Sequence, residues 1–144
     1  MLFGKRKRLV KRILIVEDEP LTAFDNGQML IAAGYQVVAT VDRFADAMEE
    51  LDGDVEIDLI LSDVQLAGAR SGVDLAREAK RRSVPLMFVT AAPPHDAPEL
   101  ALAVLMKPYT GRTMLNAIDA ISTVLSGETP KQVRGLTLYR PDAT

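Results

Sequence analysis

Side chains that can accept and hold a phosphoryl group follow four separate apolar stretches of the chain. They are Glu17 and Asp18, Asp63, Thr90, and Lys107. Carboxylate oxygens without a cysteine or histidine nearby are ligands that suit Mg²⁺, which takes one or two carboxylates together with water and phosphate. A carboxylate nucleophile beside such a metal, with an ammonium and a hydroxyl for the phosphoryl oxygens, is the set needed to form an aspartyl phosphate.

Each of these residues also has an ordinary structural explanation. The two acids at 17 and 18 could cap a following helix, Asp63 could end a strand in a turn, and Thr90 could begin one. Lys107 could be a surface base before a proline. The same explanations must, however, coincide at four strand ends out of five, and the combination therefore favours a site.

Five short apolar runs predict strands, and apolar residues at helical spacing between the runs predict helices. These elements would position the polar residues. The predicted strands are 13–16, 35–39, 57–62, 85–89 and 103–106, and the clearest helices are 21–33, 44–52, one that includes 73–79, and one marked by Met114, Ile118, Ile121 and Leu125. In the first helix we place Ala23, Phe24, Gly27, Leu30 and Ile31 on one face. Continuous apolar strands alternating with helices indicate a parallel α/β sheet covered on both sides. The strand ends that carry the polar residues would then share one edge, where such folds bind ligands.

Two segments depart from this alternation. Residues 91–98 hold three prolines and are predicted to be a loop, which leaves 99–101 for a fourth helix that is truncated or unformed. Residues 128–144 show no helical stripe. Within them, 136–139 could add a strand to this chain or to a neighbour, and otherwise the segment is a tail.

Three crowded carboxylates need a positive partner. Two like charges 4 Å apart repel by about 4 kcal/mol at an effective dielectric of about 20. We therefore expect Mg²⁺ among the acids, with Lys107 as the second positive charge.

Composition excludes several other classes of site. The chain has no cysteine and one histidine, His95, so thiolate nucleophiles, disulfides and multi-histidine metal clusters are excluded. No apolar run approaches the roughly 18 residues of a membrane span, and we expect a cytoplasmic protein. Six Lys or Arg and no acid occur in the first twelve residues, which is typical of a solvated tail and leaves open a contact with nucleic acid or anionic lipid. We divide the chain into a basic arm (1–10), one domain (11–127) and a C-terminal tail (128–144).

The motifs together resemble those of response-regulator receiver domains of two-component signalling, over about residues 11–127. They are Ile-Leu-Ile-Val-Glu-Asp-Glu at 13–19, Asp63, Ser-Gly-Val-Asp-Leu-Ala at 71–76, Thr90, and Lys-Pro at 107–108. The resemblance implies a flavodoxin-like, doubly wound, five-stranded parallel sheet of order 2-1-3-4-5. Phe-Val-Thr-Ala-Ala at 88–92 and Tyr109 further resemble the FATGUY subclass.

The resemblance also implies a role for each site residue. Asp63 would be the phosphoacceptor, and Asp18, Asp63 and the backbone carbonyl of Gln65 would bind Mg²⁺, with Glu17 acting mainly through water. Lys107 would pair with the phosphoryl group and Thr90 would turn its hydroxyl onto it.

Three features depart from the family pattern. The position three before Lys107, usually aromatic, is Val104, and the interval from Thr90 to Lys107 is short. The usual coupling between threonine and aromatic side chain therefore cannot operate unchanged. Ala91 stands where the FATGUY run has glycine.

These observations predict a single-domain signalling protein rather than an enzyme acting on other substrates. Its donor would be a histidine kinase or histidine phosphotransfer protein, and its output a protein contact, since no DNA-binding domain fits in the remaining residues; a homodimer is possible. The alternatives are a phosphorylation-independent interaction module and a Mg²⁺-dependent phosphatase with an aspartyl-phosphate intermediate. Such phosphatases usually carry the nucleophile after the first strand, whereas Asp63 follows the third.

Overall fold

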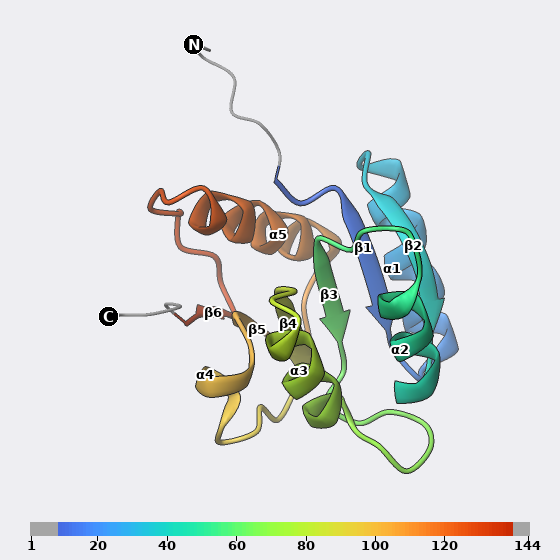
Figure 1. Ribbon diagram of the computed structural model, residues 1–144. Helices are drawn as coiled ribbons and strands as arrows, with labels where there is room; N and C mark the ends of the chain where they lie inside the picture. Colours follow the sequence, from blue (N-terminus) through green and yellow to red (C-terminus); the bar gives the residue numbers. More distant parts are fainter. Residues whose placement is uncertain (1–8, 140–144) are drawn as a thin grey trace.

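The computed structural model describes residues 9–139, which form one sheet with helices on both faces (Figure 1). The strands are β1 (Arg12–Val16), β2 (Gln36–Val41), β3 (Leu59–Ser62), β4 (Leu86–Thr90), β5 (Ala103–Met106) and β6 (Leu136–Leu138). The helices are α1 (Pro20–Ala32), α2 (Phe44–Asp52), α3 (Gly72–Arg81), α4 (Ala97–Leu100) and α5 (Gly111–Leu125). Within this range, no helix has the length and apolar character needed to cross a bilayer.

The sheet has the order β2-β1-β3-β4-β5-β6. The order of the five parallel strands is confirmed, but the predicted number of strands was one too few. The sixth strand, β6, comes from the segment 136–139, for which the sequence allowed either a strand or a tail. It pairs with β5 in the antiparallel direction. A segment of three residues is too short to predict its own pairing, because that pairing depends on whether the edge of β5 is free.

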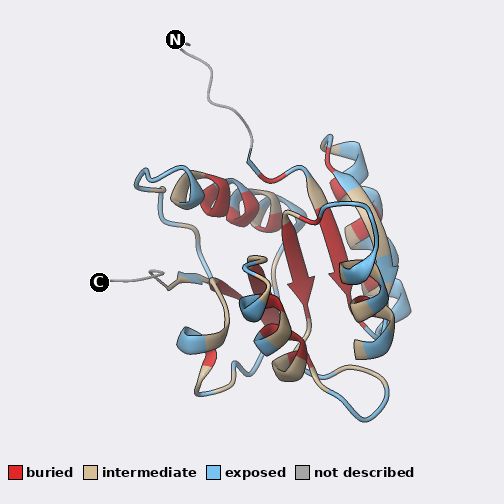
Figure 2. Ribbon diagram, in the orientation of Figure 1, coloured by how far each residue is buried: buried red, intermediate tan, exposed pale blue. Residues whose placement is uncertain are grey.

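Alternation along each strand builds two apolar cores, one on each face. One face packs Ile13, Ile15 and Leu61 against α1 and α5. The other packs Leu14, Ile60 and their neighbours on β4 against α2, α3 and α4. Figure 2 shows the buried central strands between helices whose outer surfaces are exposed. Val10, the last residue of the expected basic arm, is itself buried in the first core.

Helix α1 packs through its small residues, which corrects part of the predicted face. Ala23, Gly27 and Leu30 are buried, whereas Phe24 and Ile31 are 64% and 55% exposed. A Cβ at Gly27 would lie 4.0 Å from the Ile15 side chain, so the helix lies close to the sheet. Close approach selects the small residues, and the two large side chains one position further round the helix point to solvent.

Helix α4 is a single turn of four residues, which agrees with the prediction that the fourth helix would be truncated. It begins at Ala97, two residues before the predicted remnant, because Pro98 is tolerated in a first helical turn, where its missing N–H has no partner to lose. Ala97 is buried against α3 and the sheet.

Candidate functional site

Three carboxylates meet where β1 and β3 end side by side. One oxygen from each of Glu17, Asp18 and Asp63 lies within 4.8 Å of the other two. The backbone of each strand end is fixed by its neighbour: the Asp63 N–H donates to the Val16 carbonyl at 3.0 Å, and the Glu17 N–H donates to the Val41 carbonyl at 2.9 Å. The predicted grouping of acids therefore follows from the parallel pairing of these strands.

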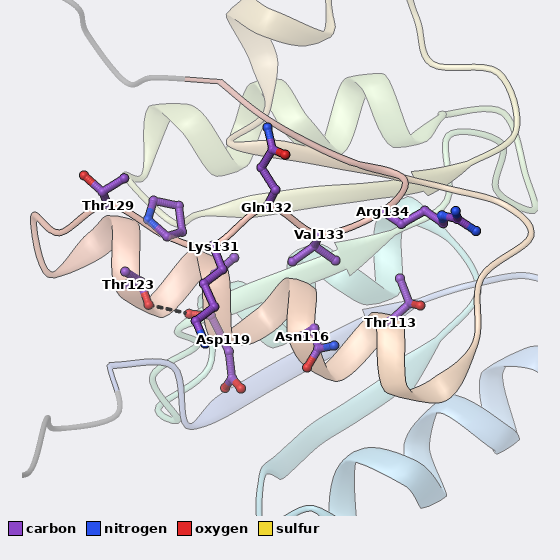
Figure 3. Close-up of a pocket in the computed structure, with 11 residues that line it drawn as sticks. Thr113, Asn116, Asp119, Thr123, Thr129, Lys131, Gln132, Val133 and Arg134 are labelled. Carbon is purple, nitrogen blue, oxygen red and sulfur yellow. Dashed lines mark hydrogen bonds between the residues drawn. The ribbon is translucent and has the colours of Figure 1, made fainter.

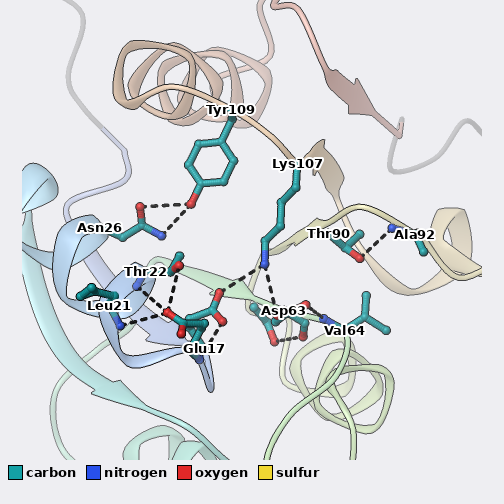
Figure 4. A network of polar contacts seen from close by, with 12 residues as sticks. Glu17, Leu21, Thr22, Asn26, Asp63, Val64, Thr90, Ala92, Lys107 and Tyr109 are labelled. Atoms are coloured by element: carbon teal, nitrogen blue, oxygen red, sulfur yellow. Dashed lines mark hydrogen bonds and ion pairs between the residues drawn. The ribbon is translucent and has the colours of Figure 1, made fainter.

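Lys107 reaches the acids from the end of β5 (Figure 4). Its Nζ lies 3.3 Å from Asp63 Oδ2 and 3.7 Å from Glu17 Oε1. Its backbone N–H donates to the Thr90 carbonyl at 3.0 Å, and its bond to Pro108 is cis. Burial alone would lower the pKa of Lys107, but the Glu17 and Asp63 carboxylates raise it by more. The site therefore holds a positively charged ammonium at neutral pH.

Glu17 is the buried member of the acidic group, with 6% of its surface exposed. Its Oε2 accepts the Glu19 N–H at 3.0 Å. Burial raises the pKa of Glu17, and the Glu19 hydrogen bond and Lys107 oppose that rise. Helix α1 is capped by Glu19, whose Oε1 accepts the N–H groups of Leu21 and Thr22. Because Glu19 caps the helix, Glu17 and Asp18 are left for the site.

The backbone around Asp63 is held tightly by the start of α3. Asp63 Oδ1 accepts the Val64 N–H at 2.7 Å, and the Gly72 N–H donates to the Val64 carbonyl at 2.7 Å. A Cβ at Gly72 would come within 2.1 Å of the Asp63 carbonyl oxygen. Position 72 therefore requires glycine, and the first turn of α3 fixes the loop that carries Asp63.

The donor set fits Mg²⁺. Three acids and one lysine leave a net formal charge of −2, and all the candidate ligand atoms are oxygens, as this cation prefers. Asp18 is exposed and Asp63 partly so, which leaves room for the waters that Mg²⁺ retains. Gln65 lies two residues beyond Asp63 with an exposed side chain; its carbonyl as a ligand remains a prediction.

Thr90 lies on the adjacent strand, but the structure does not join its hydroxyl to the acids. Thr90 is buried at the end of β4, and its Oγ1 accepts the Ala92 N–H at 3.0 Å. Within residues 9–139, no hydrogen bond links this hydroxyl to Asp63. Figure 4 shows it turned toward Ala92.

One residue beside the site was not found by sequence reasoning. Asn26 of α1 exchanges hydrogen bonds with the Tyr109 hydroxyl, at 2.9 Å from its nitrogen and 3.2 Å from its oxygen. Burial raises the pKa of Tyr109. Together with Lys107, the pair borders a cleft of about 800 Å³. A polar residue on a helix carries no local signal for such a contact, because its partner is distant in the sequence.

Comparisons with known proteins agree with this geometry. The sequence profile described as "Response regulator receiver domain" matches residues 13–119. The chain is 35% identical over 132 residues to the transcriptional regulatory protein PdtaR of Mycobacterium tuberculosis, which covers 82% of this chain and 62% of that protein. It is 33% identical over 106 residues to the phyllosphere-induced regulator PhyR of Methylorubrum extorquens, covering 70% of this chain and 39% of PhyR. The chain thus spans less than two thirds of either relative.

Solved structures show the same fold. A CheY-like response regulator receiver domain protein from Methanospirillum hungatei superposes with a TM-score of 0.68 at 26% identity, covering 82% of this chain and 98% of that one. The response regulator PhyR from Brucella abortus gives a TM-score of 0.67 at 25% identity, covering 84% of this chain and 51% of that one.

Proposed function

The chain belongs to the response regulator receiver domain family, and from that premise we propose that it is a phosphoacceptor signalling protein modified on Asp63. The observation that carries the proposal is the position of the Lys107 ammonium, between Asp63 and Glu17 in an acidic group. A structural ion pair would need one carboxylate. Here three carboxylates are grouped together and one lysine pairs with two of them, which leaves an excess of negative charge that suits a divalent cation and a phosphoryl group.

The proposed donor is a phosphohistidine on a histidine kinase or histidine phosphotransfer protein. An Asp63 carboxylate oxygen attacks phosphorus, a P–O bond forms, the donor's P–N bond breaks, and the released imidazole nitrogen takes up a proton. The Val64 N–H orients the Asp63 carboxylate, and the Lys107 ammonium attracts the incoming phosphoryl oxygens. Mg²⁺ bound by Asp18, Asp63 and, through water, Glu17 would neutralise the charge that accumulates there.

The proposed output is a protein contact controlled by the modification. A phosphoryl group adds nearly two negative charges, and the Thr90 hydroxyl, which now only accepts a hydrogen bond from Ala92, has a proton to donate to it. The transferred group stays on the protein's own side chain until water removes it, so we expect no turnover of other substrates. The absence of cysteine suits the reducing cytoplasm, where we expect the protein to act.

Phosphorylation by acetyl phosphate with Mg²⁺ tests the proposal. Intact-mass spectrometry should show one added phosphoryl group on the wild type and none on Asp63→Asn or after chelation of Mg²⁺. Asp42→Asn is the matched control: Asp42 follows β2, an exposed acid that pairs with its neighbour Arg43.

Three outcomes would overturn the proposal. Equal labelling of Asp63→Asn would place the acceptor elsewhere. Mg²⁺ binding without labelling would favour an interaction module that is independent of phosphate. Sustained hydrolysis of p-nitrophenyl phosphate would favour a phosphatase.

A further inference from the structure

Strand β6 lies outside the part of the chain that matches the receiver family, yet it closes the edge of the strand that carries Lys107. The family match ends at residue 119, and β6 comprises Leu136–Leu138. It pairs with β5 in the register Ala103↔Leu138, Val104↔Thr137 and Leu105↔Leu136. β5 therefore has a strand on each side, β4 on one and β6 on the other.

The backbone hydrogen bonds between β5 and the β6 segment extend to Met106, the residue before Lys107. The Met106 N–H donates to the Gly135 carbonyl at 2.9 Å, and the Tyr139 N–H donates to the Leu102 carbonyl at 2.8 Å. Antiparallel pairs alternate between bonded and non-bonded residues, which makes Val104 and Thr137, midway between these two links, a bonded pair. On its other side, Met106 pairs with Thr90.

Side chains of β6 and of the residue that follows it pack against the cores on both faces of the sheet. Leu136 and Leu138 pack against the core that contains Leu105 and the α5 residue Met114. Tyr139 packs against the opposite core, which contains Val104. The connecting residues 129–134 run along α5 and border with it a groove of about 630 Å³ (Figure 3).

The carboxylate side of the site lies at least two strands away from this segment in the sheet. Glu17 and Asp18 follow β1 and Asp63 follows β3, and two strands, β4 and β5, separate β3 from β6. Loss of β6 would make β5 the sheet's edge and leave the Met106 N–H without its acceptor, while the pairing of β1 with β3 would be untouched.

We propose that β6 is a positioning element for Lys107: its seating on β5 sets the rate at which Asp63 accepts a phosphoryl group and does not set the affinity of the carboxylates for Mg²⁺. This rests on the proposed function of Asp63. A misplacement of about 1 Å can cost a reaction about 100-fold. Lys107 remains tied to Thr90 through its own N–H, so we expect a smaller effect, a roughly tenfold slower reaction.

The test compares Thr137→Pro with Thr137→Ala. Thr137 is exposed, so neither change opens a cavity, but proline removes the N–H that the ladder uses. With acetyl phosphate at saturating Mg²⁺, Thr137→Pro should label about tenfold more slowly than Thr137→Ala. The dissociation constant for Mg²⁺, from titration calorimetry, should be the same in both variants and the wild type. Amide hydrogen exchange at 103–106 should be faster in Thr137→Pro and reports whether β6 has left.

Equal labelling rates in the two variants, with faster exchange at 103–106, would overturn the inference. A parallel loss of Mg²⁺ affinity would show a global effect and would also count against it. A wild type that does not label on Asp63 would instead overturn the proposed function, so the two failures are distinct.

A cysteine pair provides a second variant that does not need proline. Ala103→Cys with Leu138→Cys joins a non-bonded antiparallel pair, whose Cα separation of about 4.5 Å permits a disulfide, and the native chain has no cysteine that could compete. The oxidised form keeps β6 seated, whereas the reduced form has lost the Leu138 contact. The oxidised form should label faster than the reduced form; equal rates would overturn the inference.

Discussion

The two halves of the site are held in different ways. The carboxylates follow β1 and β3, interior strands whose residues are almost all buried and which have parallel neighbours on both sides. Lys107 follows β5, whose outer neighbour is the three-residue, half-exposed β6. Segments with few buried contacts open at lower free energy than the core. The carboxylate half should therefore be rigid, and the lysine half adjustable.

The largest expected effect separates the two halves chemically. Lys107→Met should slow labelling of Asp63 by about 100- to 1000-fold, as the loss of one charged group that stabilises a transition state does. It should not weaken Mg²⁺ binding, because it removes a cation from among the acids. Asp18→Asn should weaken Mg²⁺ binding by about tenfold or more, since it removes a candidate ligand. Calorimetry and labelling rates, measured on the same samples, check both; a loss of Mg²⁺ affinity in Lys107→Met would mean that the halves are not separable.

The next comparison concerns stability. Leu14→Ala, in the middle of β1, should lower the free energy of unfolding by about 3 kcal/mol, because the side chain is fully buried. Leu138→Ala, on β6, should lower it by about 1 kcal/mol, because the side chain is only partly buried. Urea unfolding followed by circular dichroism measures both. Equal losses would indicate that β6 is as integral to the core as β1.

Two glycines test the two segments that hold the site, the first turn of α3 beside Asp63 and β6 beside β5. Gly72→Ala forces a Cβ against the Asp63 carbonyl and should cost about 1–3 kcal/mol of stability while weakening Mg²⁺ binding. Gly135 has a φ of +81°, and beyond its chain neighbours the nearest atom to an added Cβ is a Leu105 methyl carbon at 3.9 Å. Gly135→Ala should cost about 1–2 kcal/mol from backbone strain, slow labelling and leave Mg²⁺ binding unchanged. Thermal unfolding measures the two losses of stability, and titration calorimetry measures the two Mg²⁺ affinities. Weakened Mg²⁺ binding in Gly135→Ala would contradict the independence of the carboxylate half from β6.

The smallest expected effect is a pH dependence confined to the carboxylate half. Asp74, at the start of α3, accepts the Ser71 N–H at 2.9 Å in a capping box and pairs with Arg70. Chiefly the Ser71 hydrogen bond, helped by Arg70, holds the pKa of Asp74 below its ordinary value. A lowered folded pKa means that this stabilisation is complete above the ordinary aspartate pKa of about 3.9 and is lost as the pH falls through the folded value.

Asp74→Asn should therefore cost about 1 kcal/mol near pH 7, and the difference from wild type should shrink toward about pH 3. Urea unfolding at the two pH values measures it. Leu138→Ala is the control, because its cost should not change with pH. A constant difference for Asp74→Asn would show that its carboxylate charge does not contribute.

How far the fold could be predicted from the sequence depended on how local each signal was. The apolar runs and their order determined the five parallel strands, because a run buried on both faces has few other places to lie. The apolar stripe of α1 was misassigned at Phe24 and Ile31, since the periodicity marks a broad face and only packing against the sheet selects which part of it is buried. The contact between Asn26 and Tyr109 gave no signal because it joins positions 83 residues apart.

The sequence by itself determined which chemical groups the site would contain: acids, a hydroxyl and a lysine placed at strand ends, which parallel pairing brings to one edge of the sheet. Only the tertiary structure decided how they are held. It tied Asp63 to the first turn of α3, turned the Thr90 hydroxyl to Ala92, and placed β6 against the strand that carries Lys107. The physical reason is that residue types and spacing specify strands and their ends, whereas the seating of a three-residue strand depends on which edge the rest of the fold leaves open.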